Sequence, residues 1–331
     1  MKKNIALVTG GYSGEAEISY KSAITVANNI NKELYNFYII DINVDGWFYK
    51  NEKDEKCEVN IANFSIIFNQ QKIQFDCVLM CLHGTPGEDG KLQGYFDLLK
   101  IPYTNCDVAT SALTFNKRYT IAVAAFGGID VAKSEHLFKH TSYSINHLKT
   151  NLSFPVFVKP NNGGSSLGMS KVSDSNHLED AIQKAFAVDD QVLVEEMIVG
   201  REFTIGIFKS NNSIIALPIT EIITQNEFFD YEAKYLGKSE EITPAKISEQ
   251  IKNEIELAAI KTYSLLNCKG IVRIDFIYNE KNNKPYMLEV NTVPGQSQAS
   301  IVPQQVLAMG WTLEKFYTTL IESALQHSNK K

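Results

Sequence analysis

Two apolar runs separated by a short polar stretch constrain the fold more than any other feature of this sequence. The runs are residues 270–278 and 284–290, and the residues between them, 279–283, are Asn-Glu-Lys-Asn-Asn. Apolar runs on either side of a turn-prone stretch predict a β-hairpin. One face of this hairpin can pack on a core, while the other remains available for polar side chains.

The hairpin would place four polar side chains beside one another. Facing residues in an antiparallel pair have residue numbers with a constant sum, which pairs Arg273 with Asn291 and Asp275 with Glu289. Alternate side chains of a strand point to opposite faces, so these four share one face. The apolar residues expected on the other face are Val272, Ile274, Phe276, Leu288 and Val290.

This polar group suits a divalent cation. Two carboxylates and an amide oxygen are hard ligands of the kind that Mg²⁺ takes, often together with phosphate oxygens. The alternative is a surface hairpin with a cross-strand ion pair between Arg273 and a carboxylate. The hairpin alone leaves both interpretations open.

Composition excludes some classes of partner. The chain has 331 residues, 44% of them hydrophobic, with a net charge of −6 and a pI of about 5.6. This length predicts two or three domains, and the acidic balance argues against a nucleic-acid-binding protein. Because the whole chain carries a net negative charge, an anionic substrate would have to be bound by lysines and arginines at its own site.

We expect a cytoplasmic protein with no membrane partner. The apolar stretch before Gly10 and Gly11 is too short for a signal-peptide core, and no run approaches the length of a membrane span. The five cysteines are scattered and form no Cys-x-x-Cys motif, which favours a reducing compartment.

The first part of the chain alternates strands with a helix. A helix is predicted over residues 15–31, after a glycine-rich turn, and a turn-rich loop follows from His83 to residue 90. The predicted strands are residues 4–8, 37–42 and 77–82. This alternation predicts a parallel α/β sheet, whose ligands gather at the carboxyl ends of the strands. We assign it to a first domain, residues 1–105.

Two further domains are predicted, a small central one over residues 106–198 and a last one over residues 199–331. The central elements are helix 107–126, strand 156–158, strand 169–172, helix 176–187 and strand 191–196. The last domain is expected to hold strands 203–208 and 213–220, helix 246–266, the hairpin and a C-terminal helix.

Three other segments carry candidate ligand-binding residues. Residues 159–168 place glycines and serines after Lys159 and could turn N–H groups toward an anion, although a flexible hairpin turn is equally compatible. Residues 191–198 could line an adenine ring, or form a plain buried strand. Glu15, at a helix start, would repel a phosphate and suits an ammonium ligand, unless Ser13 or Glu15 merely caps the helix.

Together these motifs resemble the ATP-grasp superfamily and, within it, the D-alanine–D-alanine ligases. The resemblance covers nearly the whole chain, with the motifs in the family's order. They include the runs at residues 10–19, 83–94, 116–117, 158–172 and 202–204, Tyr-Glu-Ala-Lys-Tyr at 231–235, Gly-x-x-Arg-x-Asp at 270–275 and Glu-x-Asn-Thr-x-Pro-Gly at 289–295. The resemblance implies an α/β (α+β) fold with a three-domain ATP-grasp architecture: an N-terminal parallel α/β domain, a small central lid domain and a C-terminal mixed-sheet domain.

The resemblance also implies a reaction. ATP phosphorylates the carboxylate of one D-alanine, the amine of a second D-alanine attacks the acyl phosphate, and phosphate leaves. The product is the dipeptide D-alanyl-D-alanine, a peptidoglycan precursor. Members of the family usually form homodimers, which we expect here.

Nucleotide and metal roles follow by resemblance alone. Asp275 and Glu289 would hold one Mg²⁺ or Mn²⁺ ion, and Glu289 with Asn291 a second. The residues implied in ATP binding are Lys117, Lys159, Ser166 and Lys234 for the phosphates, Glu195, Glu196 and Ile198 for the adenine, and Glu202 for the ribose.

Substrate roles are implied in the same way. Glu15 would take the ammonium of the first D-alanine, and Arg273 with the Gly295 N–H would form the oxyanion hole. Ser165 and Tyr235, linked to Glu15, would orient and deprotonate the second amine. Ser300 would hold the second carboxylate.

The sequence departs from the family pattern at three places. Ala16 stands where the family often has arginine, Gly163 where many members have an acid, and residues 296–301 replace a Met-Thr-x-x-Ser-Leu run. The last of these departures lies in the segment expected to form the pocket for the second substrate. A ligase for another D-amino acid should lack Glu15 and the 231–235 run, and a non-enzymatic nucleotide-binding protein should have lost a metal ligand or Arg273.

Overall fold

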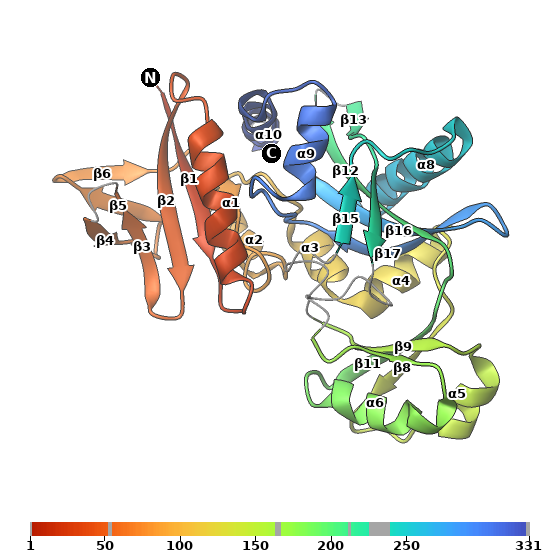
Figure 1. Ribbon diagram of the computed structural model, residues 1–331. Coiled ribbons are helices and arrows are strands. Elements are labelled where there is room, and N and C mark those ends of the chain that lie inside the picture. Colours follow the sequence, from red (N-terminus) through yellow and green to blue (C-terminus); the bar gives the residue numbers. More distant parts are fainter. Residues whose placement is uncertain (1, 52–54, 163–166, 211–212, 225–238, 329–331) are drawn as a thin grey trace.

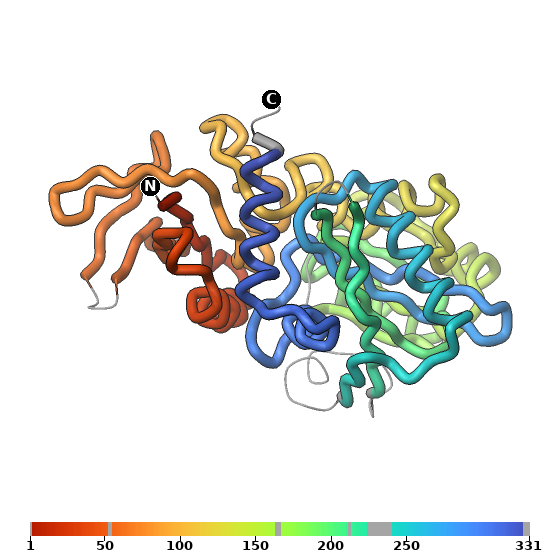
Figure 2. Tube along the Cα trace, turned by 90° about the horizontal axis from the view of Figure 1, so that it is seen from above, coloured from red at the N-terminus to blue at the C-terminus, as the bar shows by residue number. Residues whose placement is uncertain are grey.

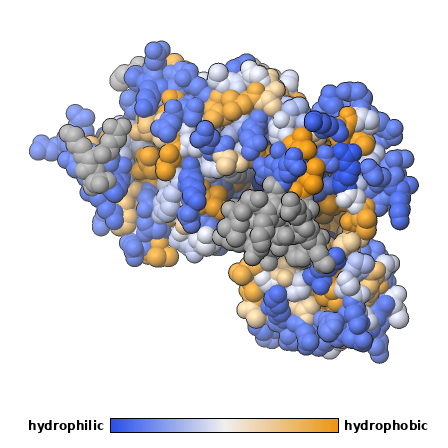
Figure 3. Space-filling model, viewed as in Figure 1, coloured by the Kyte–Doolittle hydropathy of each residue, from blue (hydrophilic) through white to orange (hydrophobic). Residues whose placement is uncertain are grey.

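The computed structural model describes residues 2–51, 55–162, 167–210, 213–224 and 239–328. The described residues form three larger β-sheets with helices packed around them (Figure 1). On the face drawn in Figure 3, apolar residues are scattered among hydrophilic ones. Within the described part of the chain, no helix combines the length and apolar content that a membrane span requires.

The first sheet is built from apolar N-terminal strands, in the order β4-β3-β2-β1-β7. As predicted, β1 pairs in parallel with β2 and β7, while β3 and β4 extend the sheet in antiparallel pairing. Its elements are β1 (Lys3–Gly10), α1 (Ala16–Asn29), β2 (Tyr35–Asn43), β3 (Gly46–Lys50), β4 (Lys56–Glu58), β7 (Cys77–Met80) and α2 (Lys91–Leu99), with the separate hairpin β5 (Ser65–Phe68) and β6 (Gln71–Gln74).

The second sheet has the order β10-β9-β11-β8, with antiparallel pairing throughout. Among the described residues, its core is built from this unit alone, including Leu137, Val158, Ile182 and Val194. The elements are β8 (Ser134–Phe138), α5 (Ile145–Asn151), β9 (Val156–Pro160), β10 (Ser170–Val172), the 3₁₀ turn η1 (Ser175–His177), α6 (Leu178–Phe186) and β11 (Gln191–Glu196).

The third sheet carries the predicted hairpin and has the order β15-β14-β12-β16-β17, with β13 paired to β12. Each of these pairings is antiparallel, and Val131 adds an isolated parallel bridge to Met287 of β17. The strands are β12 (Arg201–Ser210), β13 (Ser213–Ala216), β14 (Thr220–Thr224), β15 (Ser239–Ile242), β16 (Val272–Asn279) and β17 (Lys284–Asn291). The neighbouring helices are α3 (Val108–Phe115), α4 (Lys117–Phe126), α8 (Glu249–Leu265), α9 (Ile301–Ala308) and α10 (Leu313–Ser328).

The C-terminal helix α10 joins the first and third sheets. Figure 2 shows it between the N-terminal strands and the rest of the chain. Phe316 and Tyr317 of α10 lie in one buried cluster with Ile5 and Leu7 of β1 and with Phe208 of β12. Because apolar burial of this kind stabilises both partners, we conclude that the two sheets share a core.

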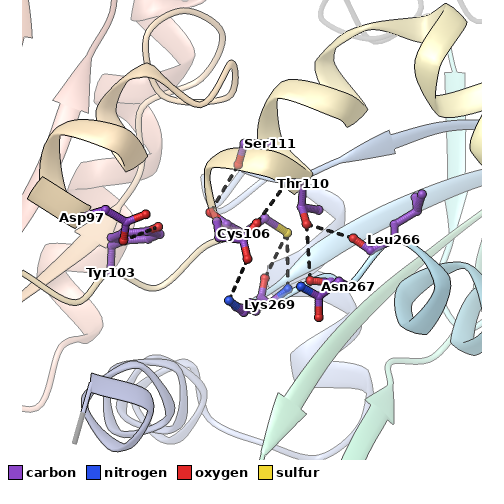
Figure 4. A network of polar contacts seen from close by, with 9 residues as sticks. Asp97, Tyr103, Cys106, Thr110, Ser111, Leu266, Asn267 and Lys269 are labelled. Carbon is purple, nitrogen blue, oxygen red and sulfur yellow. Dashed lines mark hydrogen bonds and ion pairs between the residues drawn. The ribbon is translucent and has the colours of Figure 1, made fainter. Parts of the chain in front are cut away.

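A polar network fixes the chain where it leaves the first sheet (Figure 4). The Cys106 thiol donates to the Lys269 carbonyl (3.3 Å), and Thr110 Oγ1 donates to the Leu266 carbonyl (2.9 Å). The Lys269 ammonium pairs with Asp107 at 2.7 Å. Gly270, at φ +61°, lies so close that a Cβ there would be 1.8 Å from the Thr104 carbonyl oxygen. This junction therefore requires glycine.

Two predicted elements are wrong in extent. The helix expected over residues 107–126 is two helices, because Asn116 is extended and its side chain caps α4 by accepting from the Tyr119 N–H (3.1 Å). The strand expected over residues 213–220 is likewise two strands, β13 and β14, which both pair with β12.

Candidate active site

The hairpin register is the one predicted. Arg273 faces Asn291 and Asp275 faces Glu289. A bulge after Asp275 then shifts the pairing, so that Met287 packs in the core and Leu288 is only half-buried. The expected apolar face is correct except for Leu288, because an extra residue in one strand reverses which side chains point inward.

Asp275 lies at the centre of this polar group. Its carboxylate accepts two hydrogen bonds from Arg273, from Nε at 2.9 Å and Nη2 at 2.7 Å, one from the hydroxyl of Thr204 (2.5 Å) and one from the Asn291 amide (3.2 Å). Glu289 Oε1 lies 3.9 Å from Arg273 Nη2 and is more exposed, at 34% of its side chain against 9% for Asp275. The strands therefore bring all four predicted residues together.

The donor set fits a Mg²⁺ or Mn²⁺ ion in chemistry. It consists of oxygen ligands only, two carboxylates and an amide on adjacent strands. Among the described residues, no three His, Cys, Asp or Glu side chains form a metal cluster. An ion held here would therefore need the Asn291 amide and oxygens from a bound phosphate to complete its coordination.

Buried side chains hold the strand that supports Asp275. Thr204 lies directly opposite Asp275 on β12. Gln305 of α9, fully buried, donates to the Thr204 carbonyl (3.0 Å) and accepts from the Gly206 N–H (3.0 Å). The helix that follows Ser300 is thus tied to β12, the strand that pairs with β16 and contacts Asp275 through Thr204.

Glu15 precedes α1, and its side chain makes no capping hydrogen bond to that helix. Its carboxylate lies beside Gly84, since a Cβ on Gly84 would be 2.6 Å from Glu15 Oε2. The interpretation of Glu15 as a mere cap is therefore not supported, and the carboxylate lies at the carboxyl end of the first sheet, as expected for a ligand site.

His83 and Glu88, which received no role from the sequence, are buried beside this carboxylate. His83 Nδ1 lies 2.7 Å from the Val293 carbonyl oxygen, and burial lowers the His83 pKa to about 4. Glu88 accepts from the N–H groups of Gly84 (2.8 Å) and Val293 (3.1 Å), and burial followed by the nearby Glu15 raises its pKa. The run Gly-Glu-Asp-Gly at residues 87–90 was the available signal.

Gly295 and Ser300 lie together after the hairpin. A Cβ on Gly295 would be 2.7 Å from Ser300 Oγ, and Ser300 Oγ accepts from the Ser297 N–H at 3.0 Å. Ser300 precedes α9 without capping it by its side chain. Gly295, expected at the oxyanion, and Ser300, expected at the carboxylate of the second D-alanine, are therefore neighbours.

The second sheet carries several residues that were expected at the nucleotide. Lys159 and Glu195 form an ion pair at 2.8 Å, with side chains only 13% and 8% exposed. Glu196 accepts from the Ser153 N–H at 2.8 Å. The Lys159–Glu195 pair joins a residue expected at the phosphates to one expected at the adenine.

Other expected nucleotide residues lie nearby or outside the described chain. Lys117 begins α4, and its N–H donates to the Asn161 carbonyl (3.2 Å), which ties this helix start to the end of β9. Ile198 follows β11, and Glu202 lies in β12 beside Ile277 of β16. The expected residues outside the described part are Ser165, Ser166, Lys234 and Tyr235.

Known proteins are similar to this chain in sequence and in fold. Residues 4–106 match the family model "D-ala D-ala ligase N-terminus", and residues 115–322 match "D-ala D-ala ligase C-terminus". A D-alanine–D-alanine ligase of Flavobacterium johnsoniae is 43% identical over 98% of this chain and 99% of its own length.

Two solved structures have the same fold. The VanG D-Ala:D-Ser ligase of Enterococcus faecalis is 32% identical, with a TM-score of 0.89 over 98% of this chain and all of that one. A Bacillus anthracis D-alanine–D-alanine ligase complexed with ATP is 27% identical, with a TM-score of 0.78 over 99% of both chains. The expected ATP-grasp fold class is confirmed, and the chain belongs to the D-alanine–D-alanine ligase family.

Proposed function

We propose that this chain ligates two D-alanine molecules with ATP and forms D-alanyl-D-alanine, ADP and phosphate. The observation that carries the proposal is the placement of a cation, Arg273, and two carboxylates on one face of the β16–β17 hairpin. Membership of the family supports this reaction.

In the first step, a carboxylate oxygen of D-alanine attacks the γ-phosphorus of ATP, and ADP leaves. Asp275, Glu289 and Asn291 would hold Mg²⁺ or Mn²⁺ ions, which neutralise phosphate charge when bound. Lys117 and Lys159 supply local positive charge for the phosphates, with Ser166 and Lys234 assigned to the same task by resemblance. Glu195, Glu196, Ile198 and Glu202 are proposed to surround the adenosine.

In the second step, the amine of another D-alanine attacks the acyl carbon, and phosphate leaves with its bonding electrons. Glu15 binds the ammonium of the first D-alanine, while Arg273 and the Gly295 N–H stabilise the developing oxyanion. Ser165 and Tyr235 are proposed to take the proton of the second amine, and Ser300 to bind its carboxylate.

Organisation and assembly are proposed on the same basis. We propose three domains, residues 1–105, 106–198 and 199–331; each range contains one of the larger sheets, and helices α3 and α4 of the central range pack against the third sheet. The protein is proposed to work in the cytoplasm as a homodimer.

The test is phosphate release from ATP with D-alanine, L-alanine, D-serine or D-lactate, added singly and in pairs. We expect D-alanine alone to suffice, with L-alanine inactive and D-lactate poor as second substrate near neutral pH. Release that ignores D-alanine would overturn the proposal, whereas a high yield of D-alanyl-D-serine or D-alanyl-D-lactate would correct the second substrate only.

A further inference from the structure

Side chains of the first domain bind the segment that follows β17. The Val293 N–H donates to Glu88 Oε1 (3.1 Å), and the Val293 carbonyl lies 2.7 Å from His83 Nδ1. A carbonyl oxygen only accepts, so Nδ1 carries the proton and Nε2 accepts from the Ser22 hydroxyl at 3.0 Å. Ser22 Oγ in turn accepts from the Gln296 N–H at 3.0 Å. The backbone before and after Gly295 is therefore held from the first domain.

Glu88 also contacts the loop of the first domain that lies beside Glu15. Its other oxygen, Oε2, accepts from the Gly84 N–H at 2.8 Å. Gly84 lies beside Glu15, since a Cβ there would be 2.6 Å from both Glu15 Oε2 and Ser13 Oγ. One buried carboxylate therefore links the loop beside Glu15 to the residue two positions before Gly295.

This link has a consequence for the reaction, which rests on the proposed function. The first D-alanine would contact Glu15 through its ammonium and Arg273 and Gly295 through its carboxylate. These two groups of a single amino acid are separated by one carbon atom, so the two domains must hold their binding groups at a fixed separation. A misplacement of about 1 Å can cost on the order of a hundredfold in rate.

We infer that Glu88 is a positioning residue that sets the separation between Glu15 and the Arg273–Gly295 pair by bridging the N–H groups of Gly84 and Val293. Its position costs free energy, because burial and the Glu15 carboxylate disfavour its charge. The two N–H groups and the field of Arg273 oppose that cost.

The chain offers a matched control in the next residue. Asp89 accepts from the Thr85 hydroxyl (2.5 Å) and from the Lys91 N–H (3.3 Å), and it pairs with the Lys91 ammonium, so these contacts stay within its own loop. Glu88→Gln keeps the size of its side chain but replaces one acceptor oxygen with an NH₂ group, which cannot accept from a backbone N–H.

The experiment compares the wild type, Glu88→Gln and Asp89→Asn by phosphate release from ATP and D-alanine. For Glu88→Gln we expect kcat/KM for the first D-alanine to fall roughly tenfold to a hundredfold, while KM for ATP changes by less than about twofold. Asp89→Asn should keep the wild-type ratio of the two KM values. Ser22→Ala removes the acceptor of the Gln296 N–H but leaves both contacts of Glu88, and it should raise KM for the first D-alanine. If Glu88→Gln does not fold, Glu88→Asp, whose shorter side chain weakens the bridge between Gly84 and Val293, takes its place with the same expected loss.

The possible failures are distinguishable. Wild-type kinetics in Glu88→Gln, or equal losses toward ATP and D-alanine, would overturn the positioning role while the proposed function stands. A wild-type enzyme whose phosphate release does not depend on D-alanine would overturn the proposed function and this inference together.

Discussion

Replacing Arg273 with alanine removes the guanidinium that holds Asp275 at 2.9 and 2.7 Å and that would face the oxyanion. Loss of one oxyanion donor typically costs about 3 kcal/mol, so kcat should fall on the order of 10²–10³-fold. The Arg273 side chain is only 18% exposed, and breaking a buried ion pair costs about 3 kcal/mol of folding stability. Activity and stability should therefore both decrease.

The two effects can be separated. Phosphate release at saturating ATP and D-alanine reports kcat, and urea unfolding of the same preparation reports the free energy of unfolding. Arg273→Lys keeps the charge but not the planar pair of donors, so it should retain more of both quantities than alanine. If Arg273→Ala remained folded with a kcat within about threefold of the wild type, the assignment of an oxyanion role to Arg273 would be refuted.

Three further predictions test neighbouring residues. Because His83 has a pKa of about 4 when folded and about 6.5 when unfolded, the unfolded chain binds more protons between these values, and stability should fall by up to about 1.4 kcal/mol per pH unit as pH decreases from 6.5. Urea unfolding at several pH values should show a shallower slope in His83→Gln, and an unchanged slope would contradict this. Asp275→Asn should lower kcat at least about a hundredfold and weaken Mg²⁺ binding measured by calorimetry, and full activity would remove the metal assignment. Gly84→Ala should raise KM for D-alanine, because φ is +68° there and the new Cβ would lie 2.6 Å from Glu15 Oε2; an unchanged KM would argue against Glu15 as the ammonium ligand.

The hairpin and its polar face could be predicted because their signal is local. Strand alternation and a short turn fix the pairing of Asp275 with Glu289. The bulge that moves Met287 into the core has no such signal, since it depends on what packs against the strand. Strands β5 and β6 were missed for a related reason. β6 has the sequence Gln-Lys-Ile-Gln and β5 is only four residues long, so neither gives a clear strand signal, and the two pair with each other.

The role of Glu88 could not be derived from local sequence. Its two partners are Gly84, four residues away, and Val293, which is 205 residues away. No period or spacing relates positions so distant, and only the packing of the first sheet against the segment after β17 brings them together. The sequence predicted that the loop from His83 to residue 90 lies where ligands bind. It could not predict which carboxylate of this loop contacts the segment after β17.

The distribution of the buried clusters determines which parts of the molecule can shift independently. Among the described residues, the apolar core around β9 and β11 consists of residues of the second sheet and its helices. Asn161, at the end of β9, contacts the start of α4 through hydrogen bonds. The first and third sheets have no such independence, because α10 contributes to an interior common to both. A swing of the second sheet would thus displace Lys159, Glu195 and Glu196, the residues proposed for the nucleotide, while Glu15, Arg273 and Gly295 would keep their positions relative to one another.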